Sequence, residues 1–393
     1  MSHKPRYRLK FNGALGDIVA FTAVVRDFAL SNPDIDVEVD APFPDVFLYS
    51  SRLTNWRTSD AETIEITDQY YRDEVQRSSH GLRRHFIQAF HEIVRRKTNR
   101  PCNFTEPRPE LFLSPIEKRT PPVGGGYWVL FAGGKTDITI KHWELARYQQ
   151  LVNNLSAYGL KFVQTGGRHD VHPPLVGVLN LVGWGKAREL FRLIYHAEGV
   201  ICPITSGMHI AAALRKPCVV IGGGREEPWW EAYNNDYGNF PKPVDVPHRF
   251  LHTYGALDCC RVSGCWKKLV GDCVQQTLTP SRQTVPRCMD MISVADVAQA
   301  VLSYYPGGVP ERATVPLVDL TKEDPEGCQT GRCPPRKPLS EGDRAEVEKI
   351  GNRILASLRA GMGLGRPQEG PQSPPEPSQG SGAVPGPERP TSE

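Results

Sequence analysis

The chain has 393 residues, including 35 prolines and 36 glycines, with 47 basic against 44 acidic side chains and a formal net charge of +3. This length predicts two or three domains, and so small a net charge excludes a bulk electrostatic field for nucleic acid. No apolar run approaches the ~18 residues that span a bilayer, and no apolar signal segment follows the basic N-terminus. We therefore expect a cytoplasmic location.

Residues 1–305 alternate between strand and helix patterns. Expected strands lie at 7–11, 35–39, 127–131, 161–164, 200–202 and 218–221, and expected helices at 18–30, 82–94, 143–158, 187–197, 208–214 and 294–304. A Pro- and Gly-rich interruption at 120–126 marks a domain boundary. Two successive arrays of this kind predict an α/β fold with two doubly wound, Rossmann-like domains, at 1–122 and 123–305, facing each other across a cleft.

The last part of the chain has a different composition. A Pro-rich linker is expected at 306–338, and an amphipathic helix at 339–360 after a capping-box pattern at Ser340. Almost half of residues 361–393 are Pro or Gly and few are apolar, so this segment cannot bury enough surface to fold. It is predicted to be a disordered tail.

The first glycine-rich turn, Asn12-Gly13-Ala14-Leu15-Gly16-Asp17, lies between an expected strand and an expected helix. Gly13 and Gly16 allow a tight turn and close approach of a ligand at the carboxyl end of the sheet. The helix dipole favours the ionised form of Asp17. The alternative is structural: Asp17 caps the helix, and the glycines only form the turn.

A dinucleotide-binding interpretation also starts from this turn. Asp40 ends the second expected strand, where an acidic residue could hold the ribose of a nicotinamide cofactor. The loop, however, offers only G-x-x-G where the fingerprint is G-x-G-x-x-G. An NAD-dependent oxidoreductase is therefore a disfavoured rival.

A second turn, Thr205-Ser206-Gly207-Met208-His209, opens another helix. Free backbone N–H groups at a helix N-terminus, together with two hydroxyls, suit a diphosphate. His209 could face the same anion, or it could be a buried histidine satisfied by the backbone. Gly222-Gly223-Gly224-Arg225 follows the next strand and fits a second wall of the same cleft.

Three motifs together resemble a known family. The 12–17 turn, Lys141-His142-Trp143, and the 205–214 segment followed by Lys216-Pro217 are similar in order and spacing to the heptosyltransferase-like glycosyltransferases of family 9. The resemblance extends from about residue 7 to residue 305. It implies the GT-B architecture and an inverting, metal-independent transfer of a sugar from a nucleotide-sugar donor without a cofactor.

The resemblance also implies roles for individual residues. Asp17 would be the general base, Lys141 would contact the donor diphosphate, and Asp170 would bind the ribose. The donor would be held by the turn before the second helix, made of Thr205, Ser206, Gly207, Met208 and His209. The implied acceptor is a hydroxyl of a glycan, a lipid-linked molecule or another compound, as in lipopolysaccharide biosynthesis.

One position departs from the family pattern. Ile204 stands where the family has an aspartate that helps to bind the donor sugar, so the sequence does not assign heptose as the sugar. A catalytically degenerate GT-B protein that only binds a sugar nucleotide or a partner is therefore the non-enzymatic alternative.

Three further patterns have mainly structural interpretations. Asp34-Ile35-Asp36 has D-x-D spacing but reads as a solvated turn. The basic helix at 82–100 is typical of a solvated face, and the alternative is an acceptor-side patch for a phosphorylated glycan, an anionic membrane surface or nucleic acid. Aromatic side chains beyond the Gly222 turn could line the donor site or pack between the domains: Trp229, Trp230 and Tyr233.

Half of the ten cysteines fall within residues 259–288, and four thiolates could form a tetrahedral zinc site. Their spacing lacks the paired C-x2-C knuckles of common zinc sites, so a compact cysteine-lined loop is the alternative. The residues concerned are Cys259, Cys260, Cys265, Cys273 and Cys288.

Overall fold

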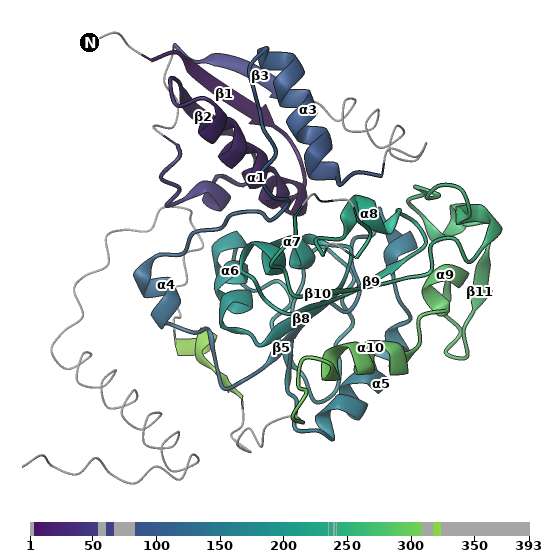
Figure 1. Cartoon of the computed structure of the whole chain (residues 1–393). Helices are drawn as coiled ribbons and strands as arrows, with labels where there is room; N and C mark the ends of the chain where they lie inside the picture. Colours follow the sequence, from purple (N-terminus) through teal and green to yellow (C-terminus); the bar gives the residue numbers. More distant parts are fainter. Residues whose placement is uncertain are drawn as a thin grey trace, which may run out of the picture. The chain divides into compact units, whose positions relative to one another are not determined.

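The computed structural model describes residues 4–53, 60–66, 83–234, 236–238, 240, 242–308 and 317–323. Within them, two parallel sheets follow one another along the chain, as Figure 1 shows. The expected helix at 339–360, the expected tail at 361–393 and Leu82 lie outside the described residues. No helix in the described residues is long and apolar enough to cross a membrane.

The first sheet has three parallel strands in the order β2-β1-β3: β1 (Arg6–Phe11), β2 (Asp36–Asp40) and β3 (Glu62–Ile66). Helices α1 (Leu15–Ser31) and α3 (Phe86–Thr98) pack with it. Every residue of α1 from Ile18 to Phe28 is buried, which explains its almost continuous apolar sequence. The two strands and the two helices expected from β1 to α3 are present, whereas β3 was not expected.

The second sheet has six parallel strands in the order β10-β9-β8-β5-β6-β7. The strands are β5 (Trp128–Leu130), β6 (Phe162–Gln164), β7 (Leu179–Asn180), β8 (Gly199–Pro203), β9 (Cys218–Gly223) and β10 (His248–His252). The chain starts at the centre with β5, moves outward through β6 and β7, and returns to add β8 on the other side of β5. The order therefore reverses between β5 and β8, and in such sheets ligands bind beyond the carboxyl ends of the strands at this point.

Alternate residues of these strands enter two different cores, as the period of two requires. Val129 and Val200 lie in a core with α6 (Ala187–His196) and α7 (Ser206–Ala213). Leu130 and Ile201 lie in a second core with α5 (Leu145–Ser156) and α10 (Val294–Leu302). Helices thus cover both faces of the sheet, which confirms the doubly wound fold.

Short elements complete the described residues. The helices α4 (Pro115–Arg119), α8 (Pro228–Glu231) and α9 (Arg287–Asp290) each span one turn. β11 (Gln276–Leu278) and β12 (Thr284–Pro286) form a hairpin, and β13 (Val318–Asp319) pairs antiparallel with β4 (Val123–Gly124). The segment expected to be a linker, 306–338, therefore contributes a strand that pairs with the start of the second domain.

Candidate functional site

The two glycine-rich turns meet where α1 packs on α7. A Cβ atom at position 16 would lie 2.7 Å from His209 Cδ2 and 3.2 Å from Ser206 Cα, so only glycine fits without a shift. Gly13 has a local reason of its own, because a Cβ there would lie 2.8 Å from the Phe11 ring. Gly16 thus allows the first turn of α1 to reach the N-terminus of α7.

Asp17 lies in the first turn of α1, and its Oδ2 accepts a hydrogen bond from Ala14 N at 3.3 Å. This contact is one half of a capping box. Asp17 is partly exposed, so capping leaves its carboxylate accessible at the turn that faces α7. The capping role is therefore present, and it is compatible with a catalytic one.

Lys141 lies beyond the end of β5, in the short 3-10 helix η3 (Thr139–Lys141). Its Nζ is 2.7 Å from Glu226 Oε1 and donates to the Ile204 carbonyl at 3.5 Å. Ile204 follows β8, so this lysine bridges the two strands between which the strand order reverses. The structure places Lys141 beside the turn that the sequence associates with it.

The turn that opens α7 divides into exposed and buried positions. Thr205 is the N-cap residue, but its side chain makes no cap hydrogen bond, and its buried Oγ1 has no partner among the described residues. Gly207 lies under the Phe131 ring, where a Cβ would be 2.5 Å from the nearest ring carbon. Met208 is wholly buried in the core. Thr205 and Ser206 thus present the polar groups of this turn.

His209 is buried between the helices, and its Nδ1 lies 2.8 Å from the Tyr233 hydroxyl. Burial lowers the pKa of His209 to about 3, with smaller contributions from His85 and Lys141. The ring is therefore neutral at physiological pH and adds no positive charge for a diphosphate. Its partner is a tyrosine side chain, whereas the structural alternative expected the backbone.

Three glutamates in the segment 226–231, one of which pairs with Lys141, were not singled out in the sequence. Glu226, Glu227 and Glu231 are all buried, and one carboxylate oxygen of each, Oε2, has no partner among the described residues. Burial would raise the pKa of Glu226, but Arg225 and Lys141 lower it, so Glu226 is ionised. The signal available in the sequence was the Glu-Glu-Pro-Trp-Trp-Glu run directly after the Gly222–Arg225 turn.

Helix α8, which carries Glu231, is attached to the start of α3. His85 Nε2 lies 3.2 Å from the Glu231 carbonyl oxygen, and the Trp230 ring centroid is 6.2 Å from that of Phe86. Trp230 and Tyr233 are wholly buried, so they pack between elements of the two domains. The packing interpretation of these aromatic residues therefore matches their positions.

Asp170 lies in a tight turn after β6, where its N–H donates to the Gly167 carbonyl at 3.1 Å. This turn packs against the segment before Lys141, because Gly134 and Val171 form a bridge. Asp170 also acts electrostatically on His142, the neighbour of Lys141. It therefore lies on the same side of the sheet as the Lys141 segment.

The five cysteines of the 259–288 region lie close enough to influence one another electrostatically. All are free thiols, and burial raises the pKa of Cys259 and Cys265 and that of Cys288 to about 12. In the described part of the chain, no three His, Cys, Asp or Glu side chains are arranged to hold a metal ion.

The remaining candidates have ordinary ionic partners. Asp34 pairs with Arg100 at 3.0 Å, and Asp36 lies 3.6 Å from Arg6. On the basic helix, Arg95 pairs with Glu92 at 2.7 Å. Such contacts are typical of a solvated surface.

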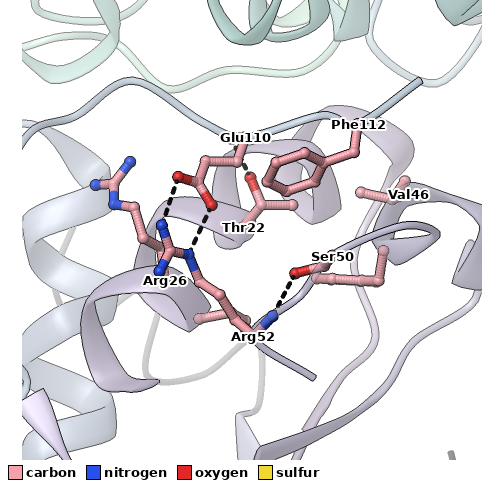
Figure 2. Close-up of a pocket in the computed structure, with 9 residues that line it drawn as sticks. Thr22, Arg26, Val46, Ser50, Arg52, Glu110 and Phe112 are labelled. Atoms are coloured by element: carbon pink, nitrogen blue, oxygen red, sulfur yellow. Dashed lines mark hydrogen bonds and ion pairs between the residues drawn. The ribbon is translucent and has the colours of Figure 1, made fainter. Parts of the chain in front are cut away.

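A small pocket in the first domain is lined by residues of α1 and nearby loops, as Figure 2 shows. Its polar groups are already paired: Arg52 Nε donates to Glu110 Oε2 at 3.1 Å, and Glu110 N donates to Thr22 Oγ1 at 2.7 Å. None of the three motif segments contributes to its lining. The candidate site is therefore the group around Asp17, Lys141 and the α7 turn.

Comparison with known proteins gives a family match to part of the chain. Residues 71–244 match the model of glycosyltransferase family 9 (heptosyltransferase), a region that includes Lys141 and the α7 turn. No curated protein matches the sequence.

Solved structures with similar folds include the family 9 glycosyl transferase from Veillonella parvula DSM 2008 (TM-score 0.52, 11% identity, 77% of this chain and 98% of that chain). The iron-containing dodecameric glycosyltransferase TibC from enterotoxigenic E. coli H10407 is also similar (TM-score 0.53, 17% identity, 78% of each chain). TibC in complex with ADP-D-beta-D-heptose gives a TM-score of 0.54 at 15% identity, covering 78% of this chain and 77% of that chain.

The fold and the family match define a glycosyltransferase of GT-B architecture. Within this class, residues 71–244 match the heptosyltransferase family 9, the family that the three motifs resemble. The oxidoreductase alternative has no support from these comparisons.

Proposed function

We propose that the protein transfers a sugar from a nucleotide-sugar donor to an acceptor hydroxyl, with inversion at the anomeric carbon and without a metal ion. The observation that carries the proposal is the contact of Gly16 with Ser206 and His209, which sets the Asp17 turn against the α7 turn. A similar fold, that of TibC, has been solved with ADP-D-beta-D-heptose, which supports a nucleotide-sugar donor.

The donor diphosphate would bind at the N-terminus of α7, beside Lys141. Backbone N–H groups at this terminus and the unpartnered Thr205 hydroxyl suit phosphate oxygens. Lys141 is paired with Glu226 in the structure, so the diphosphate would have to share the lysine with that carboxylate or displace it. Asp170 remains the proposed contact for the ribose.

The chemical step needs one base and one group that stabilises the leaving diphosphate. Asp17 would accept the proton of the acceptor hydroxyl as its oxygen attacks the anomeric carbon, and the bond from that carbon to the diphosphate oxygen breaks. Negative charge grows on the departing nucleoside diphosphate, where Lys141 and the α7 N–H groups would stabilise it. These groups would supply the charge that a metal ion supplies in other transferases.

The experiment is to screen UDP-, GDP-, ADP-, dTDP- and CMP-sugars by thermal shift, with NAD as control, and then to assay Asp17→Asn with the donor found. Loss of a general base costs about 10²–10⁴-fold in rate. We expect that loss with donor affinity changed by no more than a few-fold. Near-normal turnover of Asp17→Asn would mean that Asp17 serves only as a helix cap.

Metal independence is tested by measuring activity in the presence of EDTA. Activity should survive EDTA, and a strict requirement for Mg²⁺ or Mn²⁺ would contradict the proposal. Elemental analysis of the same protein separates a structural site from a catalytic one. Zinc or iron near one equivalent, retained by an enzyme that works in EDTA, would assign the metal to the 259–288 cysteines.

The acceptor is proposed only as a hydroxyl of a glycan or lipid-linked molecule, and the location as cytoplasmic. Contact of the basic helix α3 with an anionic membrane has weaker support, because Arg95 and Arg96 both pair with Glu92. A vesicle-sedimentation assay with and without phosphatidylserine tests it.

A binding-only function is the second candidate, because Ile204 replaces the expected aspartate. It predicts that the chain binds a sugar nucleotide tightly and neither transfers nor hydrolyses the sugar. The donor screen followed by product analysis distinguishes the two.

A further inference from the structure

Buried polar atoms without a partner in the described part of the chain occur at the α7 turn and in the segment 226–231, which includes Glu226, the ion-pair partner of Lys141. They are Thr205 Oγ1 and the Oε2 atoms of Glu226, Glu227 and Glu231, none of which has a hydrogen-bond partner among the described residues. A buried polar atom without a partner costs about 1–3 kcal/mol, so a group of them needs an explanation. A bound molecule rich in hydroxyl groups would satisfy such atoms.

Glu231 is the member of this group that lies near both halves of the site. Only 5% of the residue is exposed. Its carboxyl group is close enough to Lys141, Glu226 and Asp17 for their charges to act on it. The Glu231 carbonyl oxygen lies 3.2 Å from His85 Nε2, a contact that holds the backbone of α8. A sugar bound between the proposed diphosphate contact and the proposed base would therefore come near Glu231.

The segment that leads into α7 lacks a carboxyl group at the position expected to bind the sugar. Ile204 precedes Thr205 at the position where the family resemblance predicts a sugar-binding aspartate, and its side chain is buried and apolar. The side chain at this position therefore cannot accept a hydrogen bond from a sugar. The α8 side offers a carboxyl group with a free oxygen.

We propose that Glu231 binds a hydroxyl of the donor sugar and thereby sets donor specificity, in place of the missing aspartate. This inference rests on the proposed function and adds to it a residue that recognises the sugar portion of a nucleoside diphosphate sugar. Glu231 is a substrate-contacting residue in this proposal, while Glu226 remains the partner of Lys141.

The protonation state of Glu231 suits the role. Burial raises the pKa of Glu231 to about 8, and Glu226 and Asp17 add to the rise while Lys141 opposes it. At neutral pH the group is therefore a carboxylic acid, which can donate one hydrogen bond and accept others. A sugar hydroxyl has the same dual capacity. Glutamine matches a neutral carboxyl in shape and in this capacity, whereas leucine matches it only in bulk.

The test compares two ligands by calorimetry on the full chain: the sugar nucleotide with the largest thermal shift in the screen, and the nucleoside diphosphate of the same base. In Glu231→Leu we expect affinity for the sugar nucleotide to fall about 10- to 100-fold, from the cost of an unpaired hydroxyl. Affinity for the nucleoside diphosphate should change by less than about three-fold. Glu231→Gln should retain both affinities within about three-fold.

Glu198→Leu is the matched control. Glu198 lies just before β8, at the opposite end of the strand from Thr205, and its Oε2 accepts from Tyr305 at 2.7 Å. Glu198→Leu should leave the affinities for the sugar nucleotide and for the nucleoside diphosphate unchanged. If Glu231→Leu does not fold, Glu231→Asp takes its place, with a loss confined to the sugar nucleotide.

Equal losses for both ligands would overturn the inference, because they would mean that Glu231 only positions Lys141. Unchanged affinity for the sugar nucleotide would overturn it as well. If the native chain binds no sugar nucleotide in the panel, the proposed function itself fails, which is a different result from either.

Discussion

Two buried carboxyl groups in this protein have opposite surroundings. Asp27, in the first domain, has no exposed surface and accepts hydrogen bonds from Arg26 at 2.8 Å and from Thr105 Oγ1 at 2.6 Å, with His91 Nε2 at 2.8 Å. Glu231, in the second, has an oxygen without a partner among the described residues. Burial opposes ionisation of both, but the partners of Asp27 lower its pKa to about 2, while that of Glu231 rises to about 8.

The difference teaches how to separate structural from functional polar groups in this fold. A buried carboxylate whose acceptor positions are filled holds elements together, as Asp27 holds α1 to α3 through His91. A buried carboxyl group with an unfilled position reduces stability and is retained only if something else uses it. Three predictions test this comparison.

The largest expected effect is the loss of stability when Asp27 is replaced. Asp27→Ala removes the buried carboxylate that pairs with Arg26, and breaking a buried ion pair in this way costs about 3–5 kcal/mol. We expect that loss in the free energy of unfolding, measured by urea denaturation. Glu231→Leu, which replaces an unsatisfied carboxyl group, should be neutral or stabilising. Similar losses in the two variants would remove the distinction between these carboxyl groups.

A smaller effect is expected in the pH dependence of stability. The folded-state pKa of Glu231, about 8, lies above the unfolded value near 4.3, so unfolding releases a proton between these pH values. The contribution of Glu231 to native stability must therefore fall as pH rises through this window. Between pH 5 and pH 7, melting curves should show the unfolding free energy of Glu231→Gln rising relative to that of the native chain, by roughly 2.5 kcal/mol.

Three buried histidines make stability rise with pH, but their contribution is the same in the native chain and in Glu231→Gln. It therefore cancels from the difference between the two proteins. Burial lowers the pKa of His85, His209 and His248 to about 3, below the unfolded value near 6.5. Their contribution is present above pH 6.5 and is lost as pH falls toward 3, in both proteins alike. A pH-independent difference between the native chain and Glu231→Gln would show that Glu231 is ionised at neutral pH.

The smallest effect is expected from shortening the chain. Ending it after Gly308 removes β13, which makes a two-residue pairing with β4, and Leu317, which packs near Gly125. We expect a loss of about 1 kcal/mol or less, with donor affinity and the Glu231 pH signature intact. A chain ending after Glu323 should restore the loss. If the shorter chain folds but cannot bind donor, residues beyond 308 belong to the site.

Much of the fold could be predicted because its signals are local. β8 and β9 are continuous apolar runs, and the turns before α1 and α7 carry glycine where backbones approach. β10, with the sequence His-Arg-Phe-Leu-His, was missed because its pattern is half polar and its place depends on pairing with β9. The same holds for β13, whose partner β4 lies far away in sequence.

The candidate site also contains residues that the sequence could reveal and a residue that it could not. Asp17, Lys141 and Thr205 each belong to a short motif, so the sequence could nominate them. Glu231 belongs to a single-turn helix whose position depends on the contact of its carbonyl with His85. No spacing along the chain reveals that contact, and a glutamate after two tryptophans reads as an ordinary surface residue.

The contact between Gly16 and His209 has a consequence for how related sequences can diverge. A side chain at position 16 would occupy the space of the imidazole ring, which lies 2.7 Å from where a Cβ would be. Side chains at positions 16 and 209, which belong to different domains, therefore compete for the same space. A larger residue at 16 requires a smaller one at 209. Replacing His209 by alanine should remove the larger clash of Gly16→Ala and leave the 3.2 Å contact with Ser206 Cα, whereas Gly16→Ala alone would force α1 and α7 apart. In a chimera, the first domain of one relative should accept the second domain of another only when this pair is compatible.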